Sequence, residues 1–199
     1  MTTLDQPNNS IDGFNPKPLS QSALTVAGVA AAFLLIPLIA MQFSTDVNWT
    51  ISDFIFAFVM IFGTGFTYKL VTRTTSDVTY RIAVGFTVFS ALLLVWVNLA
   101  VGIVGSEDNP FNVLYFGVLF VGIIGSLFVR FQAKGMIYVL GVASLVIVGI
   151  TIAAFIQGFH QAPQGSVYQL LGVNAFFIML FLICAVTFYH ASKNRPLIL

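Results

Sequence analysis

Two adjacent carboxylates, Glu107 and Asp108, stand in a short polar turn that continues with Asn109 and Pro110. Carboxylate and amide oxygens are the ligands that Ca²⁺ and Mg²⁺ prefer, so this composition could hold a divalent cation. The turn lacks the longer ligand pattern of an EF-hand. The alternative is a solvated connector, in which Asp and Asn side chains bond their own backbone and the Asn-Pro pair separates two helices.

Asp53 and His160 are expected at the same face of the membrane as this turn. Together with Glu107, Asp108 and Asn109 they form a predicted cation-attracting site, because like charges repel one another and no basic residue is expected nearby. Asp53 has a second interpretation. In the first turn of a helix its side chain could cap the helix, and its charge would be favoured by the helix dipole.

Three amide side chains, Asn98, Asn112 and Asn174, lie in or beside apolar runs. They could bond across helices, a contact worth about 0.6 kcal/mol, or they could line a polar vestibule. Such a vestibule would open toward the acidic turn. Together, the vestibule and the acidic turn would form a cation-attracting entrance above an otherwise apolar bundle.

The residues that are missing exclude several classes of function. No ionisable side chain is expected near the middle of any apolar run, whereas proton relays and many ion pumps require one. Cys184 is the single cysteine, so it cannot form an internal disulfide or a CxxC pair. The sequence contains neither a phosphate-binding glycine loop nor a HExxH pair. No cofactor is predicted, and a non-enzyme is favoured over an enzyme.

One pair of residues bears on an enzyme interpretation. Ser126, which follows Gly125, and His190 resemble the serine and histidine of rhomboid-type intramembrane serine proteases, and the resemblance implies an intramembrane hydrolase. Leu127 stands where that family has glycine. Both residues are also expected at the cytoplasmic edge, so the hydrolase is the least favoured alternative.

The composition of the chain indicates an integral membrane protein. Apolar residues make up 58% of the chain and charged residues 8%, the mean hydropathy is +0.97, and the net charge of +1 predicts no nucleic-acid partner. Six apolar runs each approach the ~20 residues needed to cross ~30 Å of hydrocarbon, which predicts an all-α bundle of six transmembrane helices. The runs are 22–43, 51–71, 81–105, 111–130, 135–157 and 167–189.

The basic residues predict the orientation of this bundle. Every Lys and Arg falls on one side of the membrane if the amino terminus is cytoplasmic, as the positive-inside rule requires. Both termini are therefore predicted to be cytoplasmic. The expected organisation is a polar tail over 1–21, a membrane domain over 22–190 and a short basic tail over 191–199.

Small residues predict where the helices approach one another. Gly102 and Gly105 would share one face of the third helix, and Gly122, Gly125 and Ser126 lie together in the fourth. Small side chains at such positions allow close helix contacts. These five are the predicted helix-packing residues, and close packing alone would explain them without any activity.

The stretch WVNLAVGIVGSEDNPFN, with the following LYFGVLFVGIIGSLFVRFQAKGM, resembles a group of small bacterial polytopic membrane proteins that carry no assigned activity. The resemblance implies a multi-pass protein of the bacterial inner membrane. From the residues, we expect a small permease or channel-like protein for an ion or small solute, with an acidic outer vestibule. The alternative is a non-catalytic accessory or assembly subunit of a larger membrane complex, and homo-oligomerisation would be compatible with both.

Overall fold

The computed structural model of the chain describes residues 18–44, 47–159 and 166–193. Helices are the regular elements of this part, which contains no strand, and six of its helical segments are long and apolar enough to cross a membrane. The elements are α1 (Leu19–Phe43), α2 (Ile51–Thr72), α3 (Val78–Ala100), the 3-10 helix η1 (Pro110–Val113), α4 (Leu114–Phe128), α5 (Ala133–Ile156) and α6 (Val167–Lys193). The predicted all-α class with six membrane helices is confirmed.

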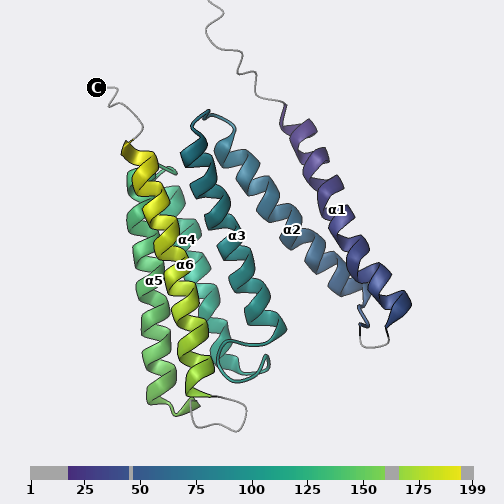
Figure 1. Cartoon of the computed structure of the whole chain (residues 1–199), viewed down its shortest axis with the longest axis vertical. Helices are drawn as coiled ribbons and strands as arrows, with labels where there is room; N and C mark the ends of the chain where they lie inside the picture. The colour runs from purple at the N-terminus through teal and green to yellow at the C-terminus, as the bar shows by residue number, and fades with distance from the viewer. Residues whose placement is uncertain (1–17, 45–46, 160–165, 194–199) are drawn as a thin grey trace, which may run out of the picture.

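A bundle of four helices carries most of the buried residues. α5 and α6 pack along each other, α3 lies against α6, and α4 lies against α5. α1 packs on α2, which in turn meets α3, and the α1–α2 pair leans away from the other helices toward the end opposite the carboxyl terminus (Figure 1). α3 and α4 have few contacts with each other, and both line the same cavity.

Side-chain caps fix where α2 and α3 begin. The Asp53 carboxylate accepts a hydrogen bond from the Thr50 amide at 2.7 Å, and the Thr50 hydroxyl accepts one from the Asp53 amide at 3.4 Å. The Asp77 Oδ1 atom accepts from the amides of Thr79 at 2.9 Å and Tyr80 at 3.2 Å. Each cap satisfies amides that have no partner inside the helix and so stabilises the first turn.

Charge is segregated between the two ends of the molecule. We call the end where α6 finishes the basic end, because all the described Lys and Arg side chains belong to helix termini or turns there: Lys69, Arg73, Arg81, Arg130, Lys134 and Lys193. Asp77 is also at this end. The opposite end, which we call the acidic end, carries Asp53, Glu107 and Asp108.

The boundaries of the membrane domain differ slightly from those predicted. α1 begins at Leu19, within the predicted 1–21 tail, and α6 continues to Lys193, within the predicted 191–199 tail. Uncharged residues allow α1 to extend, and at the other end Lys193 lies in the last turn of α6, where a positive charge is favoured by the helix dipole. Residues 1–17 and 194–199, and with them most of both predicted tails, lie outside the described residues.

We expect the basic end to face the cytoplasm, since positively charged loops are retained on that side. A reporter fused after Leu199 should therefore be active in the cytoplasm, and one inserted in the α5–α6 connection should be active only when exported. An exported carboxyl-terminal reporter would contradict an even number of spans with a cytoplasmic amino terminus.

Candidate functional site

The segment between α3 and α4, residues 101–113, is a folded loop at the acidic end, which we call the acidic-end loop. Gly102 and Gly105 belong to this loop, because α3 ends at Ala100. Both have left-handed backbone conformations, with φ of +76° and +73°. The prediction that they lie on a packing face of the third helix is therefore wrong: they end the helix and turn the chain.

Gly102 allows the loop to fold back on itself. A Cβ atom at this position would lie 2.4 Å from the carbonyl carbon and oxygen of Ser106 and 2.6 Å from the amide nitrogen of Glu107. Real Cβ atoms do not approach backbone so closely, and the left-handed φ adds strain for any other residue. Only glycine fits here.

Asn112 holds the folded loop from inside. Its Oδ1 atom accepts hydrogen bonds from the amides of Ile103 at 3.1 Å and Val104 at 2.9 Å, and its Nδ2 atom donates to the Ser106 carbonyl at 2.7 Å. Asn98, on α3, donates to the Asn112 carbonyl at 3.0 Å. Non-helical backbone at the edge of a membrane bundle needs such internal partners, and Ile103 and Val104 are completely buried.

The three amides predicted to line a vestibule are all buried inside the protein. Asn98, Asn112 and Asn174 are exposed by only 3%, 4% and 1%. Asn174 on α6 accepts a hydrogen bond from the Tyr115 hydroxyl on α4 at 2.7 Å and donates to the Leu170 carbonyl at 2.7 Å. The vestibule prediction is wrong, because these side chains serve as internal partners for the backbone and for another helix.

The carboxylates at the acidic end are not drawn together into a ligand shell. Glu107 and Asp108 are exposed in the acidic-end loop, and Asp53 is engaged in the cap of α2. Asn109 Oδ1 accepts from the Phe111 amide at 3.0 Å and so starts η1. No group of three His, Cys, Asp or Glu side chains suited to a metal occurs in the described part of the chain, and His160 lies outside it. The turn has the geometry of a connector.

The fourth helix contains both a close contact and an open side. A Cβ at Gly125 would lie 2.9 Å from Val139 Cγ1, so α4 and α5 touch at this glycine. A Cβ at Gly122 would meet nothing within 4 Å. The predicted close helix contact of Gly122 is therefore wrong. Ser126 donates to the Gly122 carbonyl at 2.6 Å, a bond within its own helix.

Two further close contacts were not predicted from the sequence. A Cβ at Gly65 would lie 2.8 Å from Val26 Cγ1, which places α1 against α2. A Cβ at Gly135 would lie 2.4 Å from Val129 Cβ, at the turn between α4 and α5. Gly65 follows Gly63 by two residues, but only the fold shows which of the two faces a neighbouring helix.

Gly122 opens instead onto a cavity of about 450 Å³, which we call the central cavity. α2, α3 and α4 form its sides, and residues of α5 and α6 complete it. Gly63 on α2 also lines the cavity, and a Cβ there would likewise meet nothing within 4 Å. The missing side chains of these two glycines thus contribute to the open space between α2 and α4.

Four of the five hydroxyl side chains that line the central cavity, all except the exposed Thr67, are bonded to the helix that carries them or to a turn. Thr64 donates to the Met60 carbonyl at 2.8 Å and Thr87 to the Ala83 carbonyl at 2.9 Å. Tyr80 donates to the Phe131 carbonyl at 2.6 Å. Aliphatic and aromatic side chains make up most of the remaining wall. The cavity therefore offers an apolar guest dispersion contacts and makes no demand for polar groups.

The serine and histidine considered for hydrolysis have different surroundings. Ser126 faces the central cavity with its hydroxyl bonded within α4, while His190 is exposed near the end of α6 beside the Tyr189 ring. Between these two described residues the structure contains no hydrogen bond. A nucleophile needs its base within hydrogen-bonding reach, so the geometry does not favour the hydrolase.

Comparison of the chain with protein-family models, with curated proteins and with solved structures gave no match.

Proposed function

We propose that this protein takes up an apolar or amphipathic small molecule from the bilayer into the central cavity, and so acts as a small permease or carrier. The observation that supports this most is the central cavity itself, which has apolar walls and is lined by two glycines, Gly63 and Gly122, that face open space. Its volume of about 450 Å³ falls within the roughly 300–1,000 Å³ of small-molecule sites in proteins.

The size of the central cavity also favours one kind of occupant. A transmembrane helix is about 10 Å across and about 30 Å long, which corresponds to a volume on the order of 2,000 Å³. The cavity of about 450 Å³ is far too small to receive one. A single acyl chain or a small apolar compound fits, and the bilayer supplies such molecules at high local concentration.

An ion or a strongly polar solute is less well supported as the transported species. Among the described residues that line the cavity none is charged, and every lining hydroxyl except that of Thr67 donates to a backbone carbonyl. A dehydrated ion would find no strong ligands there, and its desolvation would cost several kcal/mol. The acidic turn could still concentrate cations near the surface, because Glu107 and Asp108 are exposed.

Filling the central cavity at Gly122 provides the test. We expect Gly122→Leu to fold, because its side chain enters open space, and to lower the affinity for a fluorescent fatty-acid probe by about tenfold or more, equivalent to ~1.4 kcal/mol. Probe binding to the purified protein in detergent would be measured by fluorescence titration, with thermal unfolding as the check on folding.

Gly117→Leu is the matched control for this substitution. Gly117 is exposed on the same helix, does not line the cavity, and a Cβ there would also meet nothing within 4 Å. The control should bind the probe as the wild type does. Equal affinities for the probe in both variants would contradict uptake into the central cavity.

A second candidate is the accessory-subunit function, and α1 supports it. Of its 25 residues only Val26 and Ala30 are buried, and its principal contacts are with α2. The rest of this apolar helix is free to pack against a helix of a partner subunit in the membrane. If Gly122→Leu leaves the affinity for the probe unchanged, the accessory-subunit function would explain the protein better than the carrier function.

A further inference from the structure

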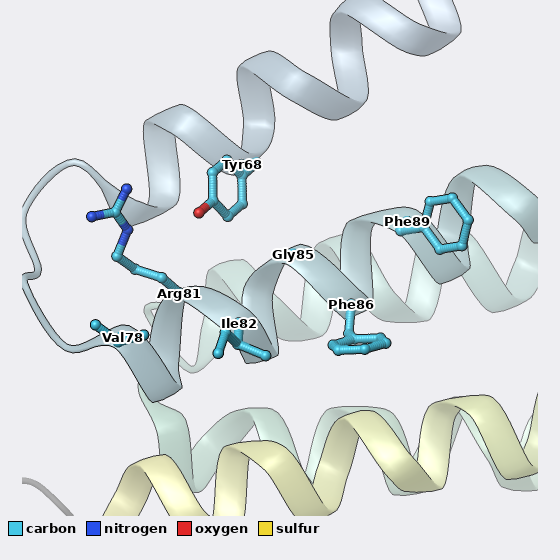
Figure 2. A pocket seen from close by; sticks show the side chains of 7 residues that line it. All are labelled: Tyr68, Val78, Arg81, Ile82, Gly85, Phe86 and Phe89. Carbon is cyan, nitrogen blue, oxygen red and sulfur yellow. The ribbon is translucent and has the colours of Figure 1, made fainter.

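A second cavity, of about 550 Å³, lies between α2 and α3 at the basic end and is separate in its lining from the central cavity. We call it the α2–α3 groove. Figure 2 shows Arg81 reaching toward the turn between the two helices, and the Tyr68 ring of α2 pointing at Gly85 of α3. The ring lies against Gly85, since a Cβ there would be in van der Waals contact with Tyr68 Cε2 at 3.5 Å.

The groove joins a cation to an apolar track. Ile82, Phe86 and Phe89 follow Arg81 along α3, and each is about half exposed, at 49%, 47% and 55%. Their spacing of three to four residues places them along one side of the helix. The groove therefore has a charged group near the end of the membrane span and apolar side chains toward its middle.

Arg81 has no ion-pair partner among the residues that the structure describes. The nearby carboxylate in sequence is Asp77, whose Oδ1 atom caps α3 through the amides of Thr79 and Tyr80. Lys69 and Arg73, at the end of α2, are exposed and add positive charge on the same side. The mouth of the groove is thus electropositive and suited to an anionic group.

We propose that the α2–α3 groove binds an anionic phospholipid, with its phosphate at Arg81 and one acyl chain along Ile82, Phe86 and Phe89. A guanidinium group can bond two phosphate oxygens at once. The Tyr68 hydroxyl, another donor in the groove lining, lies on the side toward Arg81 (Figure 2). A free phosphate ion would use the cation but leave the apolar track unfilled, so a lipid accounts for both parts of the groove.

This site is independent of the carrier function, because it uses other residues and faces the lipid around α3. Its position also agrees with the expected orientation. A basic residue beside the cytoplasmic leaflet attracts an anionic lipid, and one that lies next to the bound headgroup contributes about a fivefold increase in affinity.

Native mass spectrometry of the purified protein, titrated with phosphatidylglycerol or phosphatidylcholine, tests the proposal. The wild type should bind phosphatidylglycerol more tightly and saturably. Arg81→Gln should weaken that binding about fivefold or more and reduce the preference for phosphatidylglycerol by the same factor. Lys134→Gln, which removes one charge from the same end outside the groove, should leave the preference unchanged. Adding inorganic phosphate should displace neither lipid.

Phe86→Ala supplies a second variant that keeps the charge and exposes no buried core. It should weaken phosphatidylglycerol binding several-fold through lost chain contact. An undiminished preference for phosphatidylglycerol in Arg81→Gln would overturn the site, and so would unchanged binding in Phe86→Ala if the glutamine variant does not fold. Displacement of the lipid by phosphate would assign the groove to a soluble anion instead.

Discussion

Asn112→Ala is expected to lower the stability of the folded protein by about 3 kcal/mol, because it removes the partners of two buried amides and one partly buried carbonyl in the acidic-end loop. The amides of Ile103 and Val104 would lose their acceptor, and the Ser106 carbonyl would lose its donor. Water cannot readily replace these bonds, since Ile103 and Val104 are completely buried. In detergent, the midpoint of thermal unfolding should fall by roughly 10 °C.

Asn109→Ala is the control for this prediction. Asn109 is the same residue type in the same loop, and its side chain accepts one hydrogen bond, from the Phe111 amide at the start of η1. Its loss should cost about 1 kcal/mol, as for other caps. If the two variants unfold at the same temperature, Asn112 does not hold the loop in the way described.

Gly102→Ala is expected to have a comparable effect for a different reason. The new Cβ would lie 2.4 Å from backbone atoms of Ser106, so the chain itself would have to move. The left-handed φ of +76° adds strain of about 1 kcal/mol or more for alanine. We expect a total loss of about 3 kcal/mol in the free energy of unfolding, since displaced backbone also disturbs the hydrogen bonds to Asn112.

Gly172→Ala provides the opposite expectation. Gly172 is an exposed residue inside α6, and a Cβ there would meet nothing within 4 Å. Alanine should be tolerated or should stabilise the helix by up to about 1 kcal/mol, because it favours helix more than glycine does. Thermal unfolding of both variants, measured side by side, would refute the proposed role of Gly102 if Gly102→Ala were as stable as Gly172→Ala.

The class of the fold follows from simple physical limits that a sequence reveals. Long apolar runs must form helices when they cross a bilayer, because every backbone polar group has to be satisfied within the run. The capping function of Asp53 was also one of the two interpretations of its position in the sequence. The reciprocal hydrogen bonds between Asp53 and Thr50 show that Asp53 caps α2.

The parts that could not be predicted depend on contacts between distant residues. Apolar composition continues through Val101, Ile103 and Val104, so periodicity alone extends the third helix beyond Ala100. The loop forms because Asn112, several residues later, satisfies the backbone amides that leave the helix. A Gly-Ile-Val-Gly pattern before a polar turn could have indicated this end.

The central cavity could not be predicted from the sequence either. Gly122 and Gly125 lie three residues apart on the same helix, yet one faces open space and the other contacts Val139. Small residues permit a close helix contact without requiring one, and their spacing cannot reveal whether a neighbour is present. The arrangement of the helices in space determines which glycine has a neighbour: Gly125 faces α5, and Gly122 faces the cavity between α2, α3 and α4.

Photolabelling of the wild-type protein with a diazirine fatty acid measures most directly whether the central cavity takes up an apolar molecule. Labelled peptides would be mapped over increasing probe concentration. We expect saturable labelling of side chains that line the cavity, such as Val88 and Leu119, and labelling that rises without saturation at lipid-facing positions such as Phe120 and Ile124. Unsaturable labelling at both kinds of position, or none inside the cavity, would contradict the carrier function.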